Sequence, residues 1–151
     1  MGLDMFLEKK TYIGAHYEFR NVDAKIEITS NGKLFNINPK RVSTVIERVG
    51  YWRKANQIHK WFVDHVQNGV DNCEEYYVSR EQLQLLLDTC KIVLIDKEEA
   101  KTLLPRQEGF FFGSYEYDEY YWSDIQDTIE QLEKVLTEYP QEWSFKYMSS
   151  W

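Results

Sequence analysis

Three stretches of the chain place apolar residues at helical spacing, and this pattern limits the possible folds more than any other feature. The clearest helix begins with a capping box, in which Ser79 is the N-cap and Gln82 follows three residues later. We expect it to run to Leu94. A second helix is predicted over residues 52–66, and a third is predicted to end near Pro140. The predicted buried stripes are Ala55, Ile58, Phe62 and Val66; Leu83, Leu86, Leu87 and Cys90; and Ile125, Ile129, Leu132, Val135 and Leu136.

Strand-like segments precede, separate and follow these helices. The dipeptide Asn31-Gly32 lies between two short β-rich segments, which is the strongest short-range signal for a hairpin. We expect strands over Met5–Ile13, Lys25–Thr29, Lys33–Ile37 and Tyr76–Val78, and a final edge strand through Trp143, Phe145 and Tyr147. The sequence therefore predicts an α+β protein. We expect residues 1–151 to form a single compact domain with a small, mostly antiparallel sheet and three to four helices.

Two further segments carry signals for a helix. Asn38 and Pro39 are suited to the N-cap and first position of a helix, and the apolar residues that follow over 42–49 have helical spacing. A strand is the alternative, because the same residues are β-branched. Asp96 is suited to cap a short further helix that Pro105 bounds.

The charge of the chain is distributed unevenly. The net charge is −7, which argues against direct binding of nucleic acid and of anionic membranes. Residues 33–60 hold seven Lys or Arg and one acid, whereas residues 108–139 hold nine acids and one base. There is no apolar run long enough for a transmembrane helix, and the N-terminus lacks the apolar core of a signal peptide. Cys73 and Cys90 have no metal-ligand spacing and are expected to be free thiols in a reducing cytoplasm; the alternative is a Cys73–Cys90 disulfide.

The stretch WRKANQIHKWF, residues 52–62, is the first candidate for chemistry. On the predicted helix, Arg53 and Lys54 lie in the first turn, where the backbone N–H groups also favour an anion. Asn56 and His59 are expected to supply directional hydrogen bonds, and Trp52 a surface for stacking. The alternative is an ordinary surface helix with its usual complement of Lys and Arg.

The stretch GFFFGSYEYDEYYW, residues 109–122, is the second candidate. Its four tyrosines cannot all be buried on one helical face, so some must point outward among acids. Such a surface is typical of a protein-docking site and equally of the rim of a ligand pocket. Gly113 and Ser114 are expected either to form a turn or to leave backbone N–H groups free for a ligand.

Catalytic motifs are absent from the sequence. No phosphate loop, dinucleotide fingerprint or nucleophile elbow occurs. His59 and His65 are six residues apart, which does not place them on one helical face as a zinc motif requires. We therefore assign no catalytic residue, no metal site and no cofactor from the sequence.

Three blocks of the sequence resemble a family of small, phage-encoded accessory proteins. The blocks are GLDMFLEKKTYIGA at the start, VGYWRKANQIHKWFVDHVQNG, and LP–GFFFGS–YDEYY, and together they extend over nearly the whole chain. The resemblance implies a non-structural phage protein that acts in the cytoplasm of a bacterial host. By analogy with accessory proteins of this kind, it implies a role in countering host defence.

The leading hypothesis is a protein that binds and sequesters a nucleotide-derived small molecule, with a homo-oligomer as the expected assembly. Its ligand-binding residues would be Trp52, Arg53, Lys54, Asn56, His59, Lys60, Phe111, Ser114 and Tyr115. The alternative is a direct inhibitor of a host defence enzyme or nuclease that docks through segment 108–139. Its partner-binding residues would be Tyr117, Asp118, Glu119, Tyr121 and Asp124. A third hypothesis is a small nucleotide hydrolase in which His59 serves as acid or base.

Overall fold

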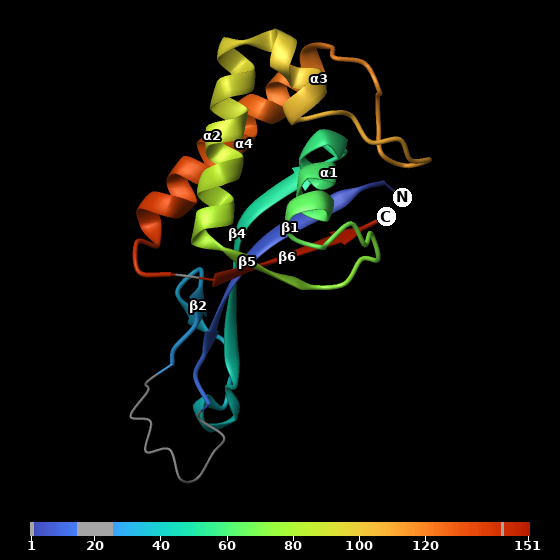
Figure 1. Cartoon of the computed structure of the whole chain (residues 1–151). Coiled ribbons are helices and arrows are strands. Elements are labelled where there is room, and N and C mark those ends of the chain that lie inside the picture. The colour runs from blue at the N-terminus through green and yellow to red at the C-terminus, as the bar shows by residue number, and fades with distance from the viewer. Residues whose placement is uncertain (1, 15–25, 143) are drawn as a thin grey trace. The chain divides into compact units, whose positions relative to one another are not determined.

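The largest sheet of the protein is antiparallel and has the strand order β4-β1-β6-β5 (Figure 1). The computed structural model describes residues 2–14, 26–142 and 144–151. The sheet strands are β1 (Asp4–Tyr12), β4 (Thr44–Arg53), β5 (Tyr76–Ser79) and β6 (Ser144–Ser150). Asp4 pairs with Ser150, so the two ends of the chain lie side by side, as Figure 1 also shows.

Helices connect the strands on one side of this sheet. They are α1 (Asn56–His65), α2 (Arg80–Ile95), α3 (Ala100–Leu103) and α4 (Glu119–Glu138), and a short 3-10 turn, η2 (Lys97–Glu99), precedes α3. Helices α2 and α4 pack along each other (Figure 1), and Lys91 of α2 forms an ion pair with Glu133 of α4 at 2.6 Å. No helix among the described residues is both long and apolar enough to cross a membrane.

The core lies between the helices and one face of the sheet. Because side chains alternate along a strand, Met5 and Leu7 of β1 point to the same face as Ser149 and Tyr147, their partners on β6. These four side chains are buried, and the ring of Tyr147 stacks on Phe62 of α1 with centroids 3.9 Å apart. The alternation in the sequence thus determines which residues of the sheet meet the helices.

The chain divides into two compact units. Residues 2–9 and 48–151 form the first unit, which contains the helices and the core. Lys10–Glu47 form the second unit, which contains the hairpin of β2 (Thr29–Ser30) and β3 (Lys33–Leu34) and the 3-10 turn η1 (Pro39–Arg41). Asn31 and Gly32 both have positive φ, 51° and 75°, as a two-residue type I′ hairpin turn requires.

Most of the expected elements are confirmed. The α+β class, the capping box at Ser79 and Gln82, the strand at 76–78, the hairpin turn and the last long helix are all present. Cys73 and Cys90 are free. Lys25, at the start of the predicted hairpin, and Trp143 lie outside the described residues.

Two expectations about the strands are wrong. The helix predicted from Asn38 ends after the single 3-10 turn, and residues 44–53 form β4. The β-branched residues of this segment thus favoured a strand over a helix. Strand β6 is not an edge strand, because it pairs with β1 on one side and β5 on the other.

Candidate functional site

The junction between β4 and α1 is held firmly against α4. The side chain of Gln131 accepts from the backbone N–H of Tyr51 (2.8 Å) and donates to its carbonyl (3.0 Å), as a neighbouring strand would. The indole N–H of Trp52 donates to Oγ1 of Thr128 at 2.9 Å, and the ring is buried in the core. These contacts fix the direction of Arg53, the last residue of β4.

The expectation that the helix begins at Trp52 is therefore wrong. Trp52 continues the alternation of buried and exposed side chains along β4. Lys54 has a positive φ of 60°, and the chain changes direction there before α1 begins at Asn56. The backbone N–H of Lys54 donates to the carbonyl of Leu3 at 2.8 Å. Arg53 and Lys54 thus project from a strand end and a tight turn, rather than from the first turn of a helix.

Asn56 joins this junction to the loop of residues 104–118, which connects α3 to α4. Its side chain is fully buried, and its Nδ2 donates to the carbonyls of Phe112 (2.9 Å) and Ser114 (3.0 Å). Its Oδ1 accepts from the backbone N–H of Gln107 at 3.2 Å and from Nη1 of Arg106 at 3.5 Å. A buried amide is stable only when its polar atoms are satisfied, so Asn56 determines the path of the loop.

Gln57 extends the same network toward α4. Its Oε1 accepts from Nη1 of Arg106 at 2.8 Å, and its Nε2 donates to Oδ2 of Asp124 at 3.1 Å. Arg106 also donates to the carbonyl of Glu116, and its side chain is only 6% exposed. Burial raises the pKa of Asp124 to about 6, against the opposing effects of Gln57 and Arg106.

Asp118 caps α4 and also contacts Arg106. Its Oδ1 accepts from the backbone N–H groups of Tyr120 and Tyr121, both at 3.1 Å, and lies 3.5 Å from Nη2 of Arg106. The hydrogen bond from the Tyr121 backbone is the largest of several effects that lower the pKa of Asp118. The charge of Arg106 is therefore balanced by nearby carboxylates.

These contacts shape a pocket of about 430 Å³, which we call the Arg53 pocket. It is lined by Arg53, Lys54, Arg106, Gly113, Ser114, Tyr120 and Asp124. The sequence predicted Arg53, Lys54 and Ser114 as ligand-binding residues, and all three line this pocket. Asn56 lies behind the pocket wall, where it holds the loop.

The Arg53 pocket carries groups that have no partner within the described part of the chain. The side chains of Arg53 and Lys54 are exposed, and within that part of the chain neither forms a hydrogen bond or an ion pair. The backbone N–H groups of Gly113 and Ser114 also make no hydrogen bond there. The side chain of Tyr120 is 68% exposed. Two free cations, two free N–H donors and an aromatic ring thus surround one cavity.

Gly113 is required for this arrangement. It has φ +92°, and a Cβ atom there would lie 3.2 Å from Cβ of Lys54 and 3.3 Å from its carbonyl oxygen. A side chain would strain the backbone and press on Lys54. Glycine therefore allows the loop to approach the turn before α1.

His59, the residue proposed as an acid or base, is fully buried and hydrogen-bonded on both ring nitrogens. Its Nδ1 lies 2.8 Å from Oη of Tyr147, and its Nε2 lies 2.9 Å from Oδ2 of Asp71. Burial lowers the pKa of His59, which outweighs the opposite effect of Asp71. The imidazole has no open edge toward the Arg53 pocket, and its contacts are those of a structural residue.

The other predicted site residues lie in several places. Trp52 is in the core, Lys60 pairs with Asp64 on α1 at 2.9 Å, and Phe111 lies in a different cavity described below. The hydroxyl of Tyr115 donates to the carbonyl of Gly109 at 3.0 Å.

The residues predicted to bind a protein partner are also divided. Tyr121 is fully buried, and its hydroxyl donates to the carbonyl of Leu104 at 2.8 Å. Tyr117 is half-buried against the Tyr121 ring, whereas Glu119 is exposed. Asp118 and Asp124 are engaged in the network around Arg106.

Sequence reasoning did not select Arg106 or Tyr120, and it placed Asp124 in the docking surface. Arg106 is the one Lys or Arg between Lys101 and segment 108–139. A single base beside an acidic segment could have been recognised in the sequence as a candidate site residue. The assignment of Tyr120 to the pocket requires the direction of α4, which the local pattern does not contain.

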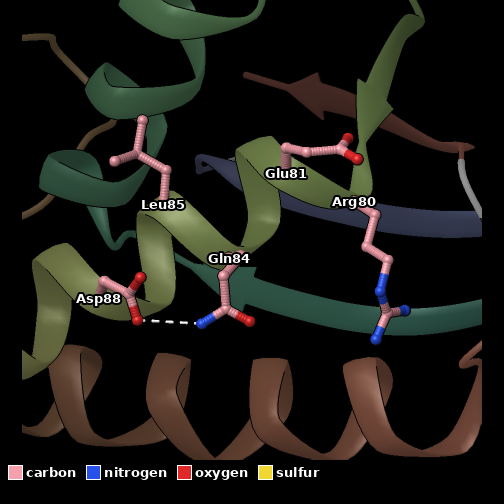
Figure 2. A pocket seen from close by; sticks show the side chains of 5 residues that line it. All are labelled: Arg80, Glu81, Gln84, Leu85 and Asp88. Atoms are coloured by element: carbon pink, nitrogen blue, oxygen red, sulfur yellow. Dashed lines mark hydrogen bonds between the residues drawn. The ribbon is translucent and has the colours of Figure 1, made fainter.

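A groove along α2 is a weaker candidate. Figure 2 shows its lining residues, Arg80, Glu81, Gln84, Leu85 and Asp88, all from α2. Gln84 donates to Asp88 at 2.9 Å, and Arg80 donates to the carbonyls of Leu136 and Tyr139. The principal polar groups of this groove are thus used within the fold, which favours a structural role.

Comparison with protein-family models, with curated proteins and with solved structures found no significant match for this chain. Among the described residues there is no group of three or more side chains suited to hold a metal ion.

Proposed function

We propose that the protein binds a nucleotide-derived small molecule in the Arg53 pocket and thereby sequesters it. The observation that carries the proposal is the position of Arg53 and Lys54, whose side chains have no partner among the described residues, beside the N–H groups of Gly113 and Ser114, which also lack one there. Cationic side chains together with unpaired backbone N–H groups are the common means by which proteins bind phosphate.

The remaining features of the pocket support a nucleotide more than a simple anion. A cavity of about 430 Å³ lies within the usual range for small-molecule sites. The exposed ring of Tyr120 provides a face on which a base can stack. Arg106 lies at the pocket with its charge balanced and its N–H groups bonded within the fold, so the net positive charge comes from Arg53 and Lys54.

Sequestration fits the site better than turnover. His59 is buried and bonded on both nitrogens, so it is not placed to transfer a proton to a ligand in the Arg53 pocket. In the phage context that the sequence resemblance implies, capture of a host signalling nucleotide would counter host defence. Direct inhibition through segment 108–139 is less favoured, because Asp118, Tyr121 and Asp124 make intramolecular contacts.

Native mass spectrometry of the protein purified from cells that produce cyclic nucleotide signals is the first test. We expect a stoichiometric mass of a chemically intact nucleotide, released on denaturation, and the same spectrum gives the oligomeric state. A hydrolysed product would instead support an enzyme. A co-purified host polypeptide without nucleotide would favour the direct inhibitor.

Calorimetric titration with a panel of probes then tests the residues. The panel contains a cyclic dinucleotide, ADP-ribose, ATP and inorganic pyrophosphate. We expect Arg53→Gln to weaken binding of the tightest-binding probe by at least about tenfold, since a hydrogen bond to a charged group contributes about 1.5–3 kcal/mol. The matched control is Arg41→Gln, which removes the same charge from an exposed position in the other unit. Equal losses in both variants, or no binding by the unaltered protein, would refute the proposal.

A further inference from the structure

A second cavity, of about 450 Å³, lies beside the 104–118 loop, and its chemistry differs from that of the Arg53 pocket. It is lined by Asp71, Gln107, Glu108, Gly109, Phe110, Phe111, Phe112 and Trp151, and we call it the Trp151 pocket. Its lining contains four aromatic rings, two carboxylates and no cation. This pocket is not part of the function proposed above.

Asp71 places a carboxylate at this pocket. Its carboxylate accepts from Nε1 of Trp151 (3.1 Å) and Nε2 of Gln107 (3.3 Å), and lies 2.9 Å from Nε2 of His59. Burial lowers the pKa of His59 and so favours the neutral imidazole; in that form, Nε2–H donates to Asp71 when Nδ1 accepts from the hydroxyl of Tyr147. Trp151, Gln107 and His59 thus hold the carboxylate in place, and neither Trp151 nor Gln107 carries a charge that would compensate it.

Gln107 adds an acceptor that has no partner. Its Nε2 is used on Asp71, and its Oε1 is buried and lacks a hydrogen bond within the described part of the chain. A buried carbonyl without a donor costs free energy, so a ligand that donates to it gains affinity. Glu108 is exposed at the same pocket and adds a second negative charge.

The aromatic walls are held in a defined position. The N–H of Phe112 donates to the carbonyl of Gly109 at 3.1 Å, and a Cβ at Gly109 would lie 2.6 Å from the Phe112 ring. Only glycine lets the ring fold back so closely. Phe112 meets Trp151 and His59 edge-on, with centroids 5.9 Å and 5.2 Å apart. Phe110 is 93% exposed and leaves its ring face open to a ligand.

We propose that the Trp151 pocket binds an alkylamine or alkylguanidinium group. Aromatic faces attract cations, and the two carboxylates add to that attraction. The acceptors on Asp71 and Gln107 require N–H donors, which favours a primary amine or guanidinium over a quaternary ammonium. The same chemistry is supplied by a free amine and by a Lys or Arg side chain of another protein, and the test distinguishes them.

The test is calorimetric titration at low ionic strength with three small probes and a peptide. The small probes are agmatine, tetramethylammonium and butyrate, and the peptide is acetyl-Gly-Arg-Gly-amide. We expect saturable binding of agmatine, weaker binding of tetramethylammonium and none of butyrate. Tighter binding of the peptide than of agmatine assigns the site to a protein side chain, and the reverse assigns it to a free amine.

Two variants on the exposed rim test the location. We expect Phe110→Ala and Glu108→Gln each to weaken agmatine binding roughly two- to fivefold, the range measured for exposed cation–π contacts and exposed ion pairs. The matched controls, Phe35→Ala and Glu98→Gln, change exposed residues outside the pocket and should leave affinity unchanged. The proposal fails if agmatine and the peptide do not bind, if butyrate binds equally, or if the rim variants match their controls. Arg53→Gln should not alter agmatine binding, so the two proposals fail independently.

Discussion

Asn56→Ala is the substitution whose effect follows most directly from the structure. The amide makes three well-formed hydrogen bonds, to Phe112, Ser114 and Gln107, and one long contact to Arg106. Each well-formed bond contributes about 1 kcal/mol net, so their loss costs about 3 kcal/mol before the cavity is counted. Because small domains are stable by only about 5–15 kcal/mol, this is a large fraction of the total.

Urea unfolding followed by near-ultraviolet circular dichroism measures this cost. We expect the midpoint to fall with little change in the slope, and the ligands of both pockets to bind more weakly because the loop is released. The matched control is Gln126→Ala, which removes an exposed amide that donates to Glu130 and should change stability by less than about 0.5 kcal/mol. A loss below about 1 kcal/mol in Asn56→Ala, with unaltered binding at both pockets, would refute the claim that this amide fixes the loop.

Three further predictions concern the pH response and the helix cap. The pKa of Asp124 is raised to about 6, so this carboxylate loses its negative charge as pH falls through 6. Affinity for a cyclic dinucleotide, whose own charge is constant in this range, should therefore rise. In calorimetry, Asp124→Asn should bind the cyclic dinucleotide more tightly at pH 7 and should lose this pH dependence. Because the pKa of His59 is lowered on folding, its contribution to stability is present above pH 6.5 and lost as pH falls below it; urea unfolding at pH 7 and 5 should show a smaller loss in His59→Gln. Ser79→Ala should destabilise the protein by about 1 kcal/mol in the same assay, since it removes the hydrogen bond to the backbone of Gln82.

The parts of the fold that could be predicted are those determined by local chemistry. The capping box at Ser79 and the turn at Asn31-Gly32 depend on residues within a few positions of each other, and both are present. The stripes of the long helices depend only on a period of 3.6 residues. The central position of β6 could not be predicted in this way, because strand order depends on which strands pair in the folded chain.

The same division applies to the candidate site. Arg53, Lys54 and Ser114 were selected from local chemistry, and the structure places them at one pocket, although on a strand end, a turn and a loop. The helix expected from Trp52 failed because its ring was needed in the core between β4 and Thr128 of α4. Arg106 and Asp124 could not be joined to Arg53 from the sequence, because only the tertiary contacts of Gln57 bring them together.

The buried polar residues at the start of α1 connect the stability of the fold to both pockets. Asn56 and Gln57 are uncharged, fully buried and satisfied almost entirely by the 104–118 loop and α4. Burial of such groups is unfavourable unless every hydrogen bond is made, so these residues select one conformation of the loop among many. That conformation places Gly113 at the Arg53 pocket and Phe110 at the Trp151 pocket. One loop thus presents an anion-binding and a cation-binding surface, and substitutions on either rim can change one without the other, whereas Asn56 affects both.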